Sequence, residues 1–295
     1  MTPVPGAADL HAAAPAAAPT VAQALAGAYT LGLDRLDASL LLGHCLQRDR
    51  AWLIAHDKVQ LSTADVQAYA ALCRRRAAGE PLAYLVGERE FHGLRLQVTP
   101  DVLVPRPDTE TLVDWALDLL RTAAWGAAAP RVLDLGTGSG AIALAVAHRH
   151  PAALVTATDL SPAALAVAAG NTRRLGLAVA FAEGGWWSAV ATAAGFDLVL
   201  SNPPYIAGDD PHLPALRHEP MLALTPGGDG LGALRQIIAG APGHLAPGGW
   251  LLLEHGWDQA AAVAALLQAA GFEAIGSRCD IEGRARCTGG RWQPA

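Results

Sequence analysis

Lysine, cysteine and long apolar runs are all scarce in this chain of 295 residues. Its four cysteines contain no C-x-x-C pair and are too few for a disulfide framework, so we expect reduced thiols in a cytoplasmic protein. No uninterrupted apolar run approaches the roughly 20 residues that a membrane-spanning helix needs. The sequence therefore predicts a soluble protein, in which the 52% of hydrophobic residues form a sizeable buried core.

Positive charge is limited as well. Lys58 is the only lysine, and 21 basic residues stand against 27 acidic ones, which leaves a net charge of −6. Tight non-specific binding to nucleic acids depends on neutralising phosphates. The overall charge therefore argues against a DNA partner, although it is compatible with a local basic patch.

The chain begins with an Ala/Pro-rich stretch that contains neither Lys nor Arg. A secretory signal needs a basic start and a continuous apolar segment, and prolines interrupt this stretch repeatedly. We therefore expect a disordered tail over residues 1–19.

Residues 20–80 have the pattern of a small helical domain. Thr20 can cap a helix, leucines recur at helical spacing over 34–46, and Ser62 with Asp65 resembles a capping box. The domain contains no cluster of ligand-like side chains.

A linker with a β-hairpin is predicted over 81–107, where the short stretches FHGLRLQV and DVLVP are separated by turn residues. A strand–helix alternation then begins at 108 and continues towards the C-terminus. Strands are predicted at 131–135, 154–159, 178–182, 196–201 and 249–254. Helices are predicted at 108–122, 140–149, 161–174, 229–240 and 258–270. This alternation predicts an α/β domain with a parallel sheet covered by helices on both faces. Residues 273–279 and 286–292 fit an antiparallel hairpin at the sheet edge.

A glycine turn joins an apolar strand to an apolar helix in Arg131-Val-Leu-Asp-Leu-Gly-Thr-Gly-Ser-Gly140. The glycines permit a sharp turn and a close approach of a ligand. The spacing G-x-G-x-G is not that of the dinucleotide fingerprint, and no Lys-Ser/Thr follows as in a P-loop. Asp159, at the end of the next strand, can accept both hydroxyls of a ribose. Asp134 can reach the other end of such a ligand or orient the loop. These features favour a nucleoside ligand, but they do not separate S-adenosylmethionine from NAD.

The strand at 196–201 runs directly into Asn202-Pro203-Pro204-Tyr205. Two prolines remove two N–H donors, so the turn presents carbonyl oxygens, and Asn202 adds a side-chain oxygen. Two converging acceptors can hold both hydrogens of a planar NH₂ group, with Tyr205 as a flat surface against it. Ligands bind at the carboxyl ends of the strands in such sheets, which favours this interpretation over a purely structural proline turn.

A nitrogen held in this way suits methyl transfer, a single in-line displacement in which positioning and charge placement provide most of the rate. Acceptors on the NH₂ hydrogens draw electron density onto the nitrogen as its new bond forms. A dedicated strong base is not needed, because the excess proton on the product nitrogen is highly acidic.

Other residues have weaker signals. Trp186 follows the third strand, where it can pack against a nucleobase or within the core. Arg106, Asp108 and Glu110 mix charge with turn residues before a helix, and helix capping explains the two acids equally well. His255 ends the fifth strand, but no second His or Cys stands at metal-ligand spacing, so no metal is expected.

These residues together give a specific resemblance, which covers about residues 20–292. The chain resembles the bacterial HemK-like protein-(glutamine-N5) methyltransferases that modify peptide chain release factors. The matching segments, in the order of the family, are Gly79-Glu-Pro-Leu-Ala-Tyr84, Arg89-Glu-Phe91, Pro105-Arg-Pro-Asp-Thr-Glu110, Asp134-Leu-Gly-Thr-Gly-Ser-Gly140, Asn202-Pro-Pro-Tyr-Ile206, Glu219-Pro220, Gly228-Asp-Gly-Leu231 and Leu253-Glu-His-Gly256.

The resemblance implies a class I methyltransferase over 108–295, Rossmann-like with a mostly parallel seven-stranded sheet, and a helical N-terminal domain that helps dock the release factor. It implies S-adenosylmethionine as the methyl donor and, as acceptor, the glutamine of the Gly-Gly-Gln tip of class I release factors. The implied cofactor contacts are Asp134, Leu135, Gly136, Thr137, Gly138, Asp159, Trp186 and Asn202. The implied substrate contacts are Asn202, Pro203, Pro204 and Tyr205, with Asn202, Pro203 and Tyr205 as the catalytic set.

The chain departs from the family at two places. Gly185 stands where many relatives have an acidic residue before the tryptophan, which puts a carboxylate bond to the adenine amino group in doubt. Near the C-terminus Asp280 and Arg286 are kept, but Arg284 and Ala285 stand between them.

Three alternatives remain at this point. A sister group methylates a glutamine of a large-subunit ribosomal protein, but it has Arg-Ser-Pro where this chain has Arg106-Pro107-Asp108. An adenine-N6 DNA methyltransferase also holds an exocyclic NH₂ with this motif, but usually has a basic recognition segment. A non-catalytic binding protein is opposed by the nearly complete set of expected contacts. We therefore expect a monomeric enzyme acting on release factors.

Overall fold

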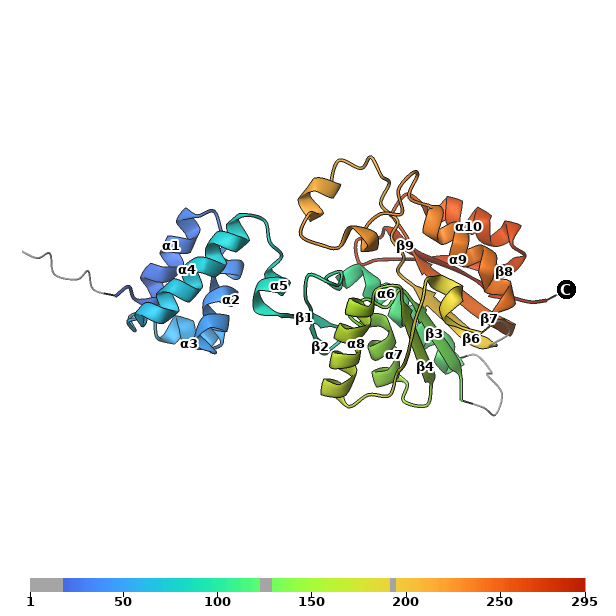
Figure 1. Cartoon of the computed structure of the whole chain (residues 1–295), viewed down its shortest axis with the longest axis horizontal. Coiled ribbons are helices and arrows are strands. Elements are labelled where there is room, and N and C mark those ends of the chain that lie inside the picture. The colour runs from blue at the N-terminus through green and yellow to red at the C-terminus, as the bar shows by residue number, and fades with distance from the viewer. Residues whose placement is uncertain (1–17, 123–128, 192–194, 295) are drawn as a thin grey trace, which may run out of the picture. The chain divides into compact units, whose positions relative to one another are not determined.

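The computed structural model describes residues 18–122, 129–191 and 195–294 (Figure 1). Residues 1–17 of the predicted Ala/Pro tail lie outside the described part. Two compact units divide the chain between Val86 and Gly87. Among the described residues, no helix has the length and apolarity required to cross a membrane.

The first unit is helical, as predicted. Its helices are α1 (Val21–Thr30), α2 (Arg35–Leu46), α3 (Arg50–Ala55), α4 (Thr63–Ala77) and α5 (Leu82–Val86). Thr20 caps α1 with a capping box completed by Gln23. The expected box at Ser62 has a different geometry, because the Asp65 carboxyl accepts the Ser62 hydroxyl at 2.7 Å and its backbone N donates back to that hydroxyl. A shared core that includes Leu41, Leu42 and Tyr69 closes the unit.

The predicted hairpin is present, but it is shorter than expected. Strands β1 (Glu88–Phe91) and β2 (Leu94–Gln97) pair antiparallel and belong to the second unit. The turn falls within the first β-like stretch, where Gly93 has a φ of +83° and donates to Glu90. The second stretch, DVLVP, is not a strand. Its Val104 donates its backbone N–H to the distant Glu219 side chain instead of to a neighbouring strand.

The second unit contains a seven-stranded sheet in the order β5-β4-β3-β6-β7-β9-β8. Its strands are β3 (Arg131–Leu135), β4 (Leu154–Asp159), β5 (Ala180–Glu183), β6 (Phe196–Ser201), β7 (Leu245–Glu254), β8 (Phe272–Cys279) and β9 (Ala285–Trp292). Neighbours pair in parallel up to β7, whereas β9 pairs antiparallel with both β7 and β8. The mostly parallel sheet is confirmed, and β3, β4 and β6 have the predicted bounds. Only β8 of the last two strands lies at the edge, because β9 inserts beside β7.

Helices cover both faces of this sheet. They are α6 (Glu110–Thr122), α7 (Ala141–Arg149), α8 (Pro162–Leu175), α9 (Gly232–Gly240) and α10 (Ala260–Ala269). Val132 and Leu198 pack with α6 and α7, whereas the adjacent Leu133 and Val199 pack with α9 and α10. Strands buried on both faces read as continuous apolar runs. Helix α9 begins later than predicted, because Asp229 accepts bonds from Leu231 and Arg235 and so belongs to the preceding turn.

The central strand β3 lies between β4 and β6, which are reached by connections in opposite directions along the sheet. Such a switch point leaves a crevice at the carboxyl ends of the strands. The glycine turn, Asp159 and the Asn-Pro-Pro-Tyr turn lie at the carboxyl ends of β3, β4 and β6 respectively. The topology therefore brings all three predicted signals to one edge of the sheet.

Candidate active site

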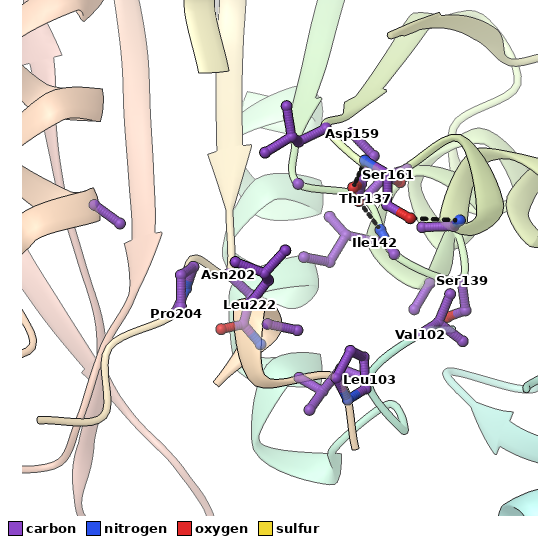
Figure 2. Close-up of a pocket in the computed structure, with 18 of the residues that line it drawn as sticks. Val102, Leu103, Thr137, Ser139, Ile142, Asp159, Ser161, Asn202, Pro204 and Leu222 are labelled. Atoms are coloured by element: carbon purple, nitrogen blue, oxygen red, sulfur yellow. Dashed lines mark hydrogen bonds between the residues drawn. The ribbon is translucent and has the colours of Figure 1, made fainter. Parts of the chain in front are cut away.

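A cavity of about 620 Å³ opens at this edge (Figure 2). Its volume lies in the range typical of small-molecule sites. The predicted site residues that line it are Gly136, Thr137, Gly138, Asp159, Trp186, Asn202 and Pro204. Figure 2 shows Asn202 and Pro204 on one side and Thr137, Asp159 and Ser161 on the other. The other four predicted residues, Asp134, Leu135, Pro203 and Tyr205, are not part of the lining.

The glycine loop is held in an unusual backbone conformation. Gly136, Gly138 and Gly140 all have positive φ, at +74°, +56° and +85°. Residues other than glycine rarely adopt such angles. The backbone N–H groups of Gly136 and Thr137 both donate to the Thr158 carbonyl, at 2.9 and 2.8 Å. A Cβ on Gly140 would also lie 2.9 Å from Leu144. The loop therefore needs glycine for its backbone shape and for close packing.

Asp134 lies beneath the loop rather than in the cavity. Its side chain is fully buried, and its Oδ2 accepts the Thr137 hydroxyl at 2.6 Å and the Ala143 backbone N–H at 3.2 Å. Burial raises the pKa of this carboxyl to about 7. Of the two roles that the sequence left open for Asp134, the structure supports the orientation of the loop. Leu135 is likewise buried and does not line the cavity, and its carbonyl accepts the Ser201 hydroxyl.

Asp159 has the position that the ribose hypothesis requires. It ends β4 at the cavity wall, where Oδ2 accepts the Gly138 N–H and Oδ1 accepts the Ser161 N–H, both at 2.9 Å. Each carboxylate oxygen has a second lone pair. Asp159 can therefore fasten the loop and still accept hydroxyl donors from a ligand.

Trp186 lies against the glycine loop. Its ring is 3.4 Å from the place where a Cβ on Gly136 would lie, and its backbone has a φ of +49°. A bulky residue in this region is an outlier that the surrounding structure must maintain. Beside it, a Cβ on Gly185 would meet only Leu160, at 3.9 Å. The position that many relatives fill with an acid is thus open in this chain.

The Asn-Pro-Pro-Tyr turn is tied to several elements at once. The Ser201 hydroxyl donates to the Leu135 carbonyl at 2.7 Å, which joins the ends of β6 and β3. The Asn202 Nδ2 donates to the Thr109 hydroxyl at 3.2 Å. The Tyr205 hydroxyl donates to Glu254 at 3.3 Å, and burial raises the pKa of the Tyr205 hydroxyl. These bonds fix the turn, and among the residues that the structure describes none donates a hydrogen bond to the Asn202 side-chain oxygen.

Sequence reasoning missed two residues that contact the Tyr205 backbone carbonyl, Gln259 and Gly230. Gln259 donates its side-chain N–H to the Tyr205 carbonyl at 3.0 Å. Gly230 lies so close that a Cβ there would be 2.3 Å from the same carbonyl oxygen. The only signal for this position in the sequence was its place in the matching segment Gly228-Asp-Gly-Leu231.

Gly230→Ala is expected to lower turnover at least about tenfold, because the new Cβ displaces the Tyr205 carbonyl, and small misplacements near reacting atoms are costly. Gly227→Ala is the matched control, since its φ of +76° nearly equals the +77° of Gly230 but a Cβ there meets nothing within 4 Å. Both variants would be compared by turnover and by circular dichroism. Equal losses in the two would mean that backbone strain alone, and not contact with the turn, explains the defect.

The charged residues before α6 turn out to be structural supports of the site. Arg106 lines the cavity and pairs with the buried Glu219 at 2.5 Å. Asp108 pairs with Arg286 at 3.0 Å.

Glu110, at the start of α6, accepts the His92 backbone N–H at 3.0 Å. His255 is buried, and its ring contacts Thr288 at 2.7 Å. Among the residues that the structure describes, no group of three or more His, Cys, Asp or Glu could hold a metal.

The sheet order, the glycine loop after the central strand and the acidic end of the next strand define a class I methyltransferase that uses S-adenosylmethionine. The PrmC N-terminal domain family matches residues 20–87, and the methyltransferase small domain family matches 110–256. The release factor glutamine methyltransferase of Bordetella pertussis is 56% identical over 88% of this chain and 95% of its own length. That of Xylella fastidiosa (strain Temecula1) is 52% identical over 91% and 97%. The chain belongs to the release factor glutamine methyltransferase family.

Solved structures of other methyltransferases share the fold. The catalytic domain of human METTL16 superposes with a TM-score of 0.56 at 14% identity and covers 81% of this chain and 86% of its own. The N-terminal domain of human METTL16, solved with SAH, gives 0.52 at 17% identity, covering 79% and 85%. At these identities the likeness shows the architecture alone.

Proposed function

We propose that this enzyme transfers the methyl group of S-adenosylmethionine to the side-chain amide nitrogen of the glutamine in the Gly-Gly-Gln motif of class I peptide chain release factors. The observation that supports this most directly is the state of Asn202. Its NH₂ is committed to Thr109, so its oxygen is left to accept a hydrogen from a planar NH₂ in the cavity. The names of relatives at 56% and 52% identity agree with this substrate. The reaction would take place in the cytoplasm.

The residues assigned to the cofactor fit its chemistry. Asp159 offers acceptors for ribose hydroxyls, and Trp186 offers an aromatic face beside the loop. Asp134 acts from below through Thr137. The full assigned set is Asp134, Leu135, Gly136, Thr137, Gly138, Asp159, Trp186 and Asn202. When bound, S-adenosylmethionine supplies an electrophilic methyl group and a thioether leaving group.

The protein contributes orientation to the reaction. The Asn202 oxygen and a backbone carbonyl of the turn accept the two amide hydrogens, and Pro203, Pro204 and Tyr205 keep the turn rigid. The amide nitrogen is thereby presented with its face towards the methyl carbon. S-adenosylmethionine would supply the methyl group and depart as its thioether, and the acceptors of the turn would stabilise the positive charge that develops on the NH₂ group. The excess proton then leaves to water.

Methyl transfer with labelled S-adenosylmethionine tests this proposal. The enzyme would be incubated separately with a release factor, the same factor with its Gly-Gly-Gln glutamine changed to alanine, a large-subunit ribosomal protein and DNA. Label is expected in the unmodified factor alone. Label in the ribosomal protein or in DNA, or equal labelling of the alanine factor, would refute the assigned substrate.

A further inference from the structure

Asn202 is the end of a buried chain of polar groups from three separate elements. Its Nδ2 donates to the hydroxyl of Thr109, which ends the short 3-10 turn Pro107–Thr109 just before α6 and is 4% exposed. The carboxyl of Glu254, which ends β7 and is 1% exposed, lies near enough to the Thr109 hydroxyl for that hydroxyl to lower the pKa of the carboxyl. Neither Thr109 nor Glu254 is among the residues assigned to the cofactor or the substrate.

The chemistry of the three groups gives this chain a direction. An ionised carboxylate only accepts hydrogen bonds. Its Oε1 accepts the Tyr205 hydroxyl, and its Oε2 is buried without a hydrogen bond among the described residues, so a lone pair is open to the Thr109 hydrogen. Once the hydroxyl hydrogen points at Glu254, the Thr109 oxygen presents lone pairs to Asn202. Asn202 then has to turn its NH₂ inwards and its oxygen towards the cavity.

The opposite orientation of the Asn202 amide would have a clear cost. It would place the amide oxygen against the Thr109 oxygen. No hydrogen would lie between them unless the Thr109 hydroxyl turned its hydrogen away from Glu254. A buried polar group that loses its partner is destabilised by about 1–3 kcal/mol, which is enough to keep one orientation dominant. The flipped amide would offer hydrogens to the cavity and would suit an acceptor such as a carboxylate instead of an NH₂ donor.

We propose that Thr109 and Glu254 are positioning residues that hold the Asn202 amide with its oxygen facing the cavity, and so select an NH₂ donor over a carboxylate at the methyl-accepting position. This inference rests on the proposed function and adds to it the reason why glutamine is distinguished from glutamate. The remainder of the network supports the pair, since Arg286 holds Asp108, the residue next to Thr109.

The protonation state of Glu254 determines the pH at which the test has to be run. Burial raises the pKa of this carboxyl to about 7, against the lowering effect of Thr109 and Tyr205. Assays at about pH 8.5 keep it ionised, so that it acts as an acceptor.

Thr109→Val is the main variant, because it replaces the hydroxyl by a methyl group of similar size, and Thr109→Ser is the matched control that restores the hydroxyl. In Thr109→Val we expect kcat to fall about 10- to 100-fold with little change in the affinity for S-adenosylmethionine, and Thr109→Ser to recover most of that loss. In an Asn202→Ala background, Thr109→Val should add almost nothing, since the two residues act as one unit.

The selectivity for glutamine over glutamate separates a positioning role from a purely structural one, because a loss of structural support alone would not change this selectivity. A release factor whose target glutamine is changed to glutamate would serve as competitive inhibitor against the unmodified factor. The preference for the glutamine factor is expected to fall about tenfold in Thr109→Val, because the freed amide can present its NH₂ to the carboxylate. An unchanged preference, equal defects in the valine and serine variants, or additive losses with Asn202→Ala would overturn the inference.

A measurement without substrate separates this inference from the proposed function. The side-chain NH₂ of Asn202, assigned by the loss of its NMR signal in Asn202→Ala, should exchange slowly with water in the wild type and faster in Thr109→Val. Slow exchange in both proteins would refute the hydrogen-bonded orientation even if release factors are methylated. Conversely, the expected exchange with no methylation of any release factor would refute the substrate but not the orientation.

Discussion

Asn202→Ala is expected to reduce methyl transfer at least a hundredfold, equivalent to about 3 kcal/mol of transition-state stabilisation. The variant loses the side-chain oxygen proposed to accept an amide hydrogen and leaves the Thr109 hydroxyl without its donor. Single-turnover kinetics with a release factor would measure the effect on the chemical step, and calorimetry would show whether S-adenosylmethionine still binds.

Asn202→Asp is the informative companion to that variant. It keeps an oxygen towards the cavity but cannot donate to Thr109, and it adds a negative charge in a partly buried position. Its transfer rate should therefore also fall, and its melting temperature should be lower than that of the wild type, because the buried Thr109 hydroxyl loses its donor. Turnover near the wild-type level in Asn202→Ala would contradict the role of Asn202 as the holder of the acceptor nitrogen.

Asp159→Ala is expected to weaken the binding of S-adenosylmethionine about a hundredfold. The variant removes the acceptors proposed for the ribose, and hydrogen bonds to charged groups contribute about 1.5–3 kcal/mol each. It also releases the Gly138 and Ser161 N–H groups, so the loop loses part of its support. Calorimetric titration of the cofactor would give the change in affinity directly.

Glu183→Ala is the matched control for Asp159→Ala. Glu183 ends the neighbouring strand β5 in register with Asp159, but it is exposed and does not line the cavity. Cofactor affinity should therefore be unchanged in this variant. A similar loss in both variants would point to a general electrostatic effect at the sheet edge instead of a specific contact by Asp159.

Local patterns in the sequence were sufficient to predict the strands β3, β4 and β6 with their observed bounds. Each of these strands is a short apolar run that ends in a strong turn signal, namely the glycine loop, Asp159 and the Asn-Pro-Pro-Tyr turn. Their common edge then follows from the rule that parallel strands end on the same side. The stretch DVLVP was predicted wrongly, because its alternation resembles a strand while its hydrogen bond goes to Glu219, far away in the chain.

The sequence by itself thus determined the class of fold, the glycine loop and the Asn-Pro-Pro-Tyr turn proposed to hold an acceptor nitrogen, since each depends on residues adjacent in the chain. Only the tertiary structure decided that Asp134 lies beneath the loop, that Gly230 and Gln259 contact the Tyr205 carbonyl, and that Thr109 is the hydrogen-bond partner of Asn202. These relations join residues from different elements, and no local period or spacing encodes them. Because these groups are buried at the end of the sheet, the loss of one such contact costs free energy, since no water is present to replace the lost partner.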